Sequence, residues 1–325
     1  MQAWLCEDPT GVESLRWTDL PDPEPGPGEV RIRVQAASLN FPDLLIVQNK
    51  YQVKPPLPFV PGAEYSGIVD HVGAEVHHLK PGDRVAALGS TGGFATVACA
   101  DARRVLALPD HLPFDQAAAF AFTYGTSHHA LMDRGALQPG ETVLVLGAAG
   151  GVGSAAVQIA KAAGARVIAG ASTDEKCAFC REIGADATIN YGREDLREAL
   201  KALTDGRGPD VVYDAVGGDL AEPAFRSIAW RGRYLMVGFA AGGIPSLPLN
   251  LPLLKGAAIL GVFWGSFTQR EPKAFARSIA DLLRWQAEGK VQPLIDRRLP
   301  MRELPAAYAH MGSRQVRGKV VLVNE

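Results

Sequence analysis

The chain has 325 residues, of which 47% are hydrophobic and 21% are charged, and its formal net charge is −2. This length and composition predict a globular protein with two domains, and the near-neutral charge argues against a nucleic-acid partner. No stretch approaches the roughly 20 apolar residues of a membrane span, and the first residues lack the pattern of a signal peptide. We therefore expect a cytoplasmic protein that binds neither membranes nor nucleic acid.

Residues 1–122 contain short strand-like segments separated by proline and glycine. The expected strands are 29–36, 67–72, 84–88, 94–99 and 105–108. Many short strands with turn signals between them predict an irregular all-β, barrel-like unit. Residues 113–132 are helical in composition, and we place the crossing into a second domain at Thr123.

A strand, a glycine-rich turn and a helix follow one another between Glu141 and Gly164. The glycines allow the backbone to approach a phosphate, and the helix N-terminus offers unpaired N–H groups and the positive end of the helix dipole. This pattern predicts that a dinucleotide pyrophosphate binds at Gly150, Gly151, Val152 and Gly153. Ala148 stands where the usual motif has its first glycine.

Strands and helices continue to alternate after this turn. The expected strands are 142–146, 166–172, 187–190, 211–216, 233–237 and 258–262, and the expected helices are 154–163, 175–183, 195–203 and 220–229. Such alternation predicts an α/β fold with a doubly wound parallel (Rossmann) sheet. An amphipathic helix is expected at 272–288, and the β tail ending at Val323 most simply rejoins the N-terminal unit. The expected domains are therefore 1–122 with 266–325, and 123–265.

The second strand of the nucleotide domain indicates which dinucleotide is bound. It ends in Gly170-Ala171-Ser172, without the acid that usually binds the ribose 2′-hydroxyl of NAD. Asp174 and Glu175 come only after it. Ser172 can donate a hydrogen bond and Lys176 supplies a cation, which are the groups that a 2′-phosphate needs. NADPH is therefore favoured, although Lys176 could also be a solvated helix residue.

Seven segments are typical of a known family. They are 38–43 (SLNFPD), 61–67 (PGAEYSG), 80–85 (KPGDRV), 148–153 (AAGGVG) with 158–161 (QIAK), 214–218 (DAVGG) and 318–319 (GK). Together they resemble the medium-chain dehydrogenase/reductase superfamily and, within it, the zinc-free NADPH:quinone oxidoreductase group, over essentially the whole chain. The resemblance implies a GroES-like fold for the all-β unit, and that group also tends to carry Ala at position 148.

The resemblance also bears on zinc. Zinc-dependent relatives place Cys where this chain has Asn40 and His where it has Ala63, and neither residue supplies a thiolate or an imidazole. Their structural zinc lobe would fall near 88–104, where only Cys99 is present. We expect no metal at either place.

The resemblance implies that the nicotinamide lies in a cleft between the domains. Asn40, Tyr51 and Thr126 are then the expected catalytic residues, with Asn40 donating an amide N–H to a substrate oxygen. Tyr51 could instead be an exposed loop residue, and Thr126 could bond back to its own helix. The remaining expected cofactor contacts, beside Asn40 and Thr126, are Ser172, Lys176, Tyr191, Gly217, Gly238, Phe239, Phe263, Trp264 and Arg317. Trp264 could instead be a core residue.

These expectations combine into an NADPH-dependent reductase that delivers hydride to a quinone or to the β-carbon of an α,β-unsaturated carbonyl. The alternatives are an enoyl-thioester reductase of the same superfamily and a non-catalytic NADPH-binding protein. A zinc alcohol dehydrogenase is disfavoured by Asn40 and Ala63. A homodimer is expected by resemblance, with the apolar loop 247–254 and the strand 258–262 as its contact.

Overall fold

The computed structural model describes residues 1–324, and the chain divides into two compact units. Unit 1 comprises Met1–Phe122 and Pro293–Glu325, and unit 2 comprises Thr123–Gln292. The return to unit 1 at residue 293 differs from the expected boundary at 266. The reason is that helices α9 (Trp264–Arg270) and α10 (Pro272–Ala287) pack in unit 2, where Phe267 stacks on His129 and Trp285 packs on His128.

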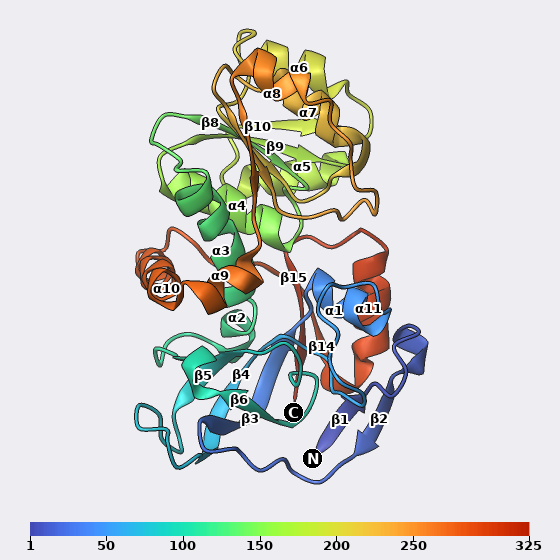
Figure 1. The fold of residues 1–325 in the computed structure, drawn as a ribbon, viewed down its shortest axis with the longest axis vertical. Helices are drawn as coiled ribbons and strands as arrows, with labels where there is room; N and C mark the ends of the chain where they lie inside the picture. Colours follow the sequence, from blue (N-terminus) through green and yellow to red (C-terminus); the bar gives the residue numbers. More distant parts are fainter. Residues whose placement is uncertain (325) are drawn as a thin grey trace. The chain divides into compact units, whose positions relative to one another are not determined.

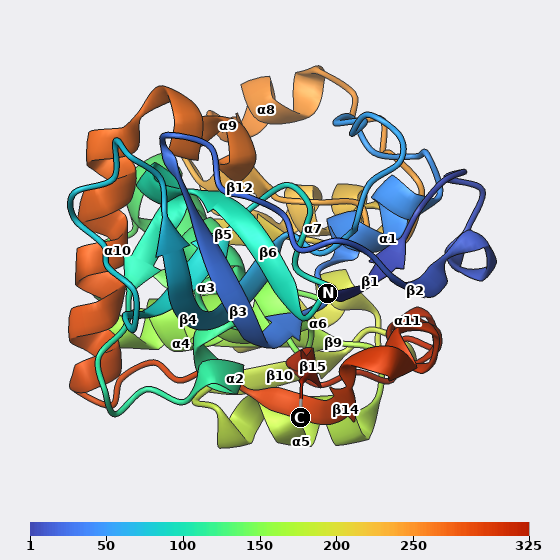
Figure 2. The same cartoon turned by 90° about the horizontal axis from the view of Figure 1, so that it is seen from below.

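Unit 1 is built on a seven-stranded sheet with the order β14-β15-β3-β4-β5-β7, in which β6 also pairs with β3 (Figure 2). Its strands are β3 (Glu29–Ser38), β4 (Glu64–Val72), β5 (Arg84–Leu88), β6 (Val97–Asp101), β7 (Val105–Ala107), β14 (Ile295–Pro300) and β15 (Lys319–Val323). A two-stranded sheet of β1 (Gln2–Leu5) and β2 (Arg16–Asp19) accompanies it. The helices are α1 (Phe41–Val47), α2 (Phe114–Ala117) and α11 (Leu304–Gly312), with 3₁₀ turns at Val12–Ser14, Ala102–Arg104 and Met301–Glu303.

Strand β3 is the centre of this sheet. Val30, Ile32 and Val34 alternate along it and are buried, as expected for a strand with one face on the core. It pairs antiparallel with β4, β6 and β15. The C-terminal strand therefore completes the N-terminal unit. The expectation of a strand-rich unit is confirmed, but the unit also contains the helices α1, α2 and α11 and is not all-β.

Unit 2 contains a six-stranded parallel sheet with the order β10-β9-β8-β11-β12-β13. Figure 1 labels β8, β9 and β10 of this sheet. The strands are β8 (Thr142–Leu146), β9 (Arg166–Ala171), β10 (Ala187–Asn190), β11 (Val211–Asp214), β12 (Arg233–Met236) and β13 (Ala258–Gly261). The helices are α3 (Ala121–His128), which carries the chain into the unit, α4 (Gly151–Ala162), α5 (Asp174–Glu182), α6 (Leu196–Leu203), α7 (Ala221–Ser227), α8 (Asn250–Lys255), α9 and α10, with a π-helical turn at His129–Arg134 and a 3₁₀ turn at Gly218–Leu220.

The strand order of unit 2 reverses at β8. The chain runs outward from β8 to β9 and β10, and then returns to the other side of β8 as β11. In open parallel sheets, ligands bind at the carboxyl ends of the strands beside such a reversal. The doubly wound sheet is thus confirmed, and the glycine-rich turn after β8 lies at its switch point.

Several short elements differ from the sequence prediction. The helical stretch expected at 113–132 is divided into α2, α3 and the π-helical turn, and the expected loop at 247–254 contains most of α8. Among the residues that the structure describes, no helix combines the length and the apolar character needed to cross a bilayer.

Candidate active site

The glycine-rich turn of unit 2 joins β8 to α4. A Cβ on Gly153 would lie 2.1 Å from the carbonyl oxygen of Gly147, so only glycine lets α4 pack this closely on the end of β8. A Cβ on Gly150 would meet that oxygen at an ordinary 3.5 Å. The protein itself therefore does not require glycine at 150, the N-cap position of α4, and its absent side chain leaves the helix N-terminus open to a ligand.

Two hydroxyl groups fix the first turn of α4 from the interior of unit 2. Ser127 Oγ donates to the carbonyl oxygen of Val152 at 2.8 Å and lies 2.9 Å from the hydroxyl of Tyr213 on β11. Thr126, the expected cofactor contact on α3, is the neighbour of Ser127 and is buried. The N–H groups of the first turn have no partner within the helix, so they remain available to an anion.

The register of β9 and β10 brings two expected contacts to the same sheet edge. Ala171 pairs with Asn190, and Ser172 and Tyr191 come directly after them. The backbone N–H of Tyr191 donates to Ala171 at 3.0 Å. Lys176 on α5 donates from Nζ to Ser172 Oγ at 3.5 Å. The structure thus gathers the expected hydroxyl and cation at the tip of the second strand.

The nearby acid is already engaged. Asp174 accepts a hydrogen bond from Asn190 Nδ2 at 2.9 Å and forms an ion pair with Arg193 at 2.9 Å. Its carboxylate, in a side chain that is 56% exposed, therefore already has two protein partners. Sequence reasoning missed Arg193, which adds a second cation to this edge and which no motif marks.

The loops after β11 and β12 are held together by Asp214. Its Oδ1 accepts from the N–H groups of Val216 and Gly217, both at 2.8 Å, and its Oδ2 accepts from the Tyr234 hydroxyl at 2.5 Å. The backbone N–H of Gly238 donates to the Asp214 carbonyl oxygen at 3.2 Å. The bracing role of Asp214 and Tyr234 was not expected from the sequence.

Gly217 and Phe239 belong to these loops and lie in contact. Gly217 has a φ of 66°, and a Cβ there would lie 2.8 Å from the ring of Phe239. This close approach fixes the two predicted contacts beside each other at the carboxyl ends of β11 and β12.

Two consecutive aromatic residues after β13 have different surroundings. Phe263 is 52% exposed, whereas Trp264 is buried and packs on Phe275 at 5.9 Å between ring centroids. A Cβ on Gly125 would lie 2.8 Å from the indole, so α3 also contacts it. The side chain of Trp264 is therefore a core side chain, and only its backbone remains for a cofactor.

Unit 1 buries a cluster of polar side chains where three strands meet. They are Ser38, Asn40, Asp43, Glu64 and Lys319, none more than 4% exposed. The sheet register brings them together, because Ser38 at the end of β3 pairs with Glu64 on β4 and with Val321 on β15. Asn40 follows β3 as the N-cap residue of α1.

Lys319 is the cation of this cluster. Its Nζ donates to the carbonyl oxygen of Leu39 at 2.9 Å, to Asn40 Oδ1 at 2.5 Å and to Glu64 Oε2 at 3.5 Å. Burial lowers the pKa of Lys319, and the charges of Glu64 and Asp43 oppose that shift. Three acceptors match the three N–H bonds of an ammonium group, so we assign Lys319 as charged.

The Asn40 carboxamide is held at both ends. Its Nδ2 donates to Glu64 Oε2 at 3.2 Å, and its Oδ1 accepts from Lys319. One amide N–H thus has a partner, and within residues 1–324 the second has none. The sequence analysis expected Asn40 to donate an amide N–H to a substrate oxygen. In the structure, the N–H bond that remains for this purpose has a fixed orientation.

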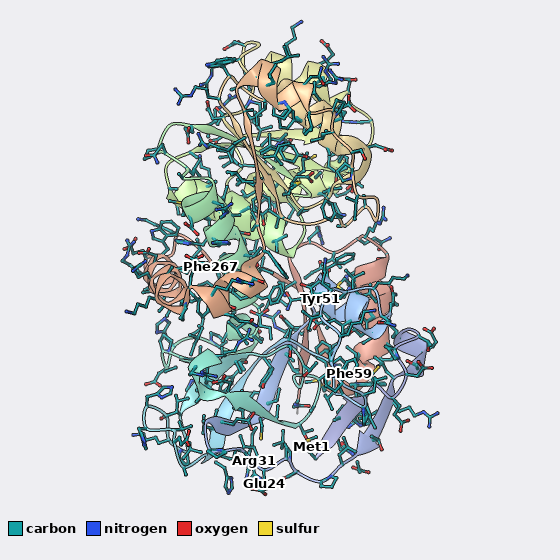
Figure 3. The ribbon with its side chains drawn as sticks, in the orientation of Figure 1. Met1, Glu24, Arg31, Tyr51, Phe59 and Phe267 are labelled. Atoms are coloured by element: carbon teal, nitrogen blue, oxygen red, sulfur yellow. The ribbon has the colours of Figure 1, made fainter. Side chains whose placement is uncertain are left out.

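Asp43 lies in α1, and Tyr51 follows this helix in the chain. Asp43 accepts from the backbone N–H groups of Asn40 at 2.8 Å and Ala63 at 3.1 Å. Burial raises the pKa of Asp43 to about 7, against the effect of these bonds and of Lys319. Tyr51 lies beside α1 in unit 1 (Figure 3), half-buried, and burial and the nearby Asp43 raise its pKa.

Arg317 belongs to unit 1 and faces an acid. Its Nε lies 3.8 Å from Asp296, which also accepts from His310 at 2.6 Å. The guanidinium is half exposed, and its expected contact with a 2′-phosphate stays a prediction.

Asn40 and Ala63, which stand where zinc-dependent relatives have zinc ligands, make hydrogen bonds within the protein. Asn40 binds Lys319 and Glu64, and Ala63 contributes only its backbone N–H to Asp43. Within residues 1–324, no three His, Cys, Asp or Glu side chains are grouped as metal ligands. The absence of zinc remains a prediction that rests on these residue types.

Comparison with known proteins relates both units to dehydrogenases. Residues 26–110 match the alcohol dehydrogenase GroES-like domain, and residues 151–281 match the family described as zinc-binding dehydrogenase. The chain is 41% identical over 290 residues to quinone oxidoreductase-like protein 2 of Bos taurus, covering 89% of this chain and 83% of that protein. It is 36% identical over 316 residues to a quinone oxidoreductase of Pseudomonas aeruginosa, covering 96% of each.

A solved structure gives the same relationship. The quinone oxidoreductase of Thermus thermophilus, which was also solved in complex with NADPH, superimposes with a TM-score of 0.86 at 35% identity. The match covers 99% of this chain and 100% of that one.

The raised pKa of Asp43 predicts a pH dependence of stability. Between about pH 4 and pH 7 the folded protein keeps a proton on Asp43 that the unfolded chain has lost. The free energy of unfolding should therefore fall as the pH rises through this window and then level off. Urea unfolding between pH 4.5 and 8 should show this fall in the wild type and a flatter profile in Asp43→Asn. Identical profiles would contradict the assignment.

Proposed function

This chain belongs to the quinone oxidoreductase group of the medium-chain dehydrogenase/reductase superfamily, and we propose that it is an NADPH-dependent reductase of quinones or α,β-unsaturated carbonyls. One observation carries the choice of NADPH. The tip of β9 presents Ser172 and Lys176 to a phosphate, while Asp174, the acid that could select a ribose hydroxyl, is bound to Asn190 and Arg193.

Unit 2 is proposed to hold the cofactor. The first turn of α4, from Gly150 to Gly153, would bind the pyrophosphate, and Ser172, Lys176 and Tyr191 would bind the 2′-phosphate with Arg193 nearby. The contacts proposed for the ribose and nicotinamide are Thr126, Gly217, Gly238, Phe239 and Phe263, with the backbone of Trp264. When bound, NADPH supplies a hydride. The open N-terminus at Gly150 and the cations at the strand tip fit this group.

Unit 1 is proposed to bind the oxygen of the acceptor. The remaining N–H of Asn40 would donate to a carbonyl oxygen, which gains negative charge as hydride reaches an enone. Lys319, 2.5 Å from the amide oxygen, increases the positive character of that N–H. A tyrosine hydroxyl keeps its proton at neutral pH, and burial raises the pKa of Tyr51 further, so its hydroxyl can donate as well. For a quinone, solvent can supply the protons.

The proposed activity predicts that purified protein oxidises NADPH in the presence of an acceptor. A panel of quinones and short enones, followed by the absorbance of reduced nicotinamide, would identify the better acceptor class. Turnover of either class supports the proposal. Tight NADPH binding without turnover of any acceptor would contradict it and favour a non-catalytic role.

Replacement of Lys176 tests the 2′-phosphate site. In Lys176→Ala, loss of a charge-assisted hydrogen bond should raise the KM for NADPH about tenfold or more and leave the KM for NADH nearly unchanged. Lys201→Ala, which removes an exposed lysine from α6, is the matched control. Equal increases for both cofactors would contradict the assignment.

A homodimer is proposed from the exposed edge of unit 2. Strand β13 has a sheet neighbour on one side only, and Ile244, Leu249, Leu253 and Leu254, which precede it in the sequence, are each more than 60% exposed. An open strand edge and exposed apolar side chains favour association with a second copy.

Sedimentation velocity would test the dimer. The wild type should sediment as a dimer, and Leu253→Glu should shift it toward a monomer because a charge would be buried in the contact. Leu57→Glu alters a 50% exposed leucine of unit 1 and should leave the dimer intact. A monomeric wild type would overturn the proposal.

A cytoplasmic location is also proposed. The four cysteines, Cys6, Cys99, Cys177 and Cys180, all carry free thiols, and burial raises the pKa of each. Unpaired cysteines are typical of proteins kept in a reducing compartment.

A further inference from the structure

We propose that Lys319 is a positioning residue whose ammonium group fixes the orientation of the Asn40 carboxamide, so that an N–H bond rather than the amide oxygen is offered to the acceptor. The inference rests on the proposed function. It adds a residue that lies 279 positions from Asn40 in the sequence and contacts both Asn40 and Glu64.

The orientation follows from donor and acceptor types. An ammonium group can only donate, so the atom of Asn40 that lies 2.5 Å from Lys319 Nζ must be the amide oxygen. The amide nitrogen then faces the Glu64 carboxylate, which can only accept, at 3.2 Å. Rotating the amide by half a turn would place donor against donor and acceptor against acceptor. Lys319 and Glu64 therefore select one of the two orientations together.

The backbone holds Lys319 where this contact requires it. Gly318 has a φ of 87°, and a Cβ there would lie 2.3 Å from the carbonyl oxygen of Leu294. The next N–H, that of Lys319, donates to the same oxygen at 2.8 Å. Only glycine permits this approach, and the lysine side chain that follows is 4% exposed. The ammonium group is thus positioned by the first residue of β15, whose backbone is held by a hydrogen bond to Leu294.

A purely structural role is the competing explanation. Lys319 also balances the buried charge of Glu64, and removal of one partner from a buried ion pair is strongly destabilising by itself. A single Lys319→Met variant would therefore not distinguish positioning from loss of fold. Removal of both charges separates the two roles, because the charge balance returns while the amide loses the ammonium donor and the carboxylate acceptor that together select its orientation.

The decisive comparison is between Lys319→Met and the double variant Glu64→Gln/Lys319→Met. The double variant should recover the Tm that the single variant loses. Its kcat should stay about tenfold below the wild type, with the KM for NADPH nearly unchanged, because a hydrogen bond in the transition state is no longer oriented. Recovery of kcat together with Tm would overturn the proposal. Lys80→Met, at an exposed lysine of unit 1, is the control for loss of a lysine.

A second measurement does not depend on turnover. The ¹⁵N-labelled side-chain amide of Asn40, identified by its loss in Asn40→Asp, should give two distinct and slowly exchanging protons in the wild type. These signals should approach each other and exchange faster in the double variant. Unchanged signals would overturn the orienting role. If the wild type reduced no acceptor, the proposed function would fail while this measurement would still decide the role of Lys319.

Discussion

A single buried carboxylate organises the polar centre of unit 1. Glu64 accepts hydrogen bonds from Ser38 Oγ, from Asn40 Nδ2, from Lys319 Nζ and from the backbone N–H of Phe122, the last residue of unit 1 before the chain enters unit 2. These donors come from three distant parts of the sequence, at residues 38–40, 122 and 319. Because a fully buried charge is tolerated only with such partners, the positions of β3, α1, β15 and the start of α3 are tied to one another.

In unit 2, we propose that backbone groups form most of the cofactor site and that a few side chains select the cofactor. The parallel register places the ends of β8, β9, β10 and β11 along one sheet edge, and the absence of a Cβ at Gly153 lets α4 begin directly behind β8. Ser127 and Tyr213 fix the first turn of α4, and Asp214 fixes the loop after β11. In the proposed cofactor site, Lys176 on α5 and Arg193 after β10 would distinguish one dinucleotide from another. The choice of cofactor would then depend on other residues than those that hold the fold of this unit.

The sequence predicted best what is local. The strands at 84–88, 142–146 and 187–190 have the expected bounds, and Ser172 and Lys176 lie within hydrogen-bonding distance because they are four positions apart. The sequence did not predict contacts between residues that are far apart in the chain. The apolar stripe of α10 was visible, but not that it packs in unit 2, so the expected boundary at 266 was wrong. Short elements such as α1 and α8 lack enough periodicity to be recognised. The contacts of Lys319 with Asn40 and Glu64 depend on strand register, which no local pattern shows.

We propose, above all, that this protein transfers hydride from NADPH to an electron-poor acceptor with amide, hydroxyl and ammonium groups in place of a metal ion. The clearest experiment is an anaerobic single turnover, in which protein of measured metal content is loaded with NADPH and mixed with a quinone or an enone. We expect one acceptor to be reduced for each NADPH oxidised, in protein without stoichiometric zinc. Turnover that requires added zinc, or NADPH that stays reduced with every acceptor, would contradict this mechanism.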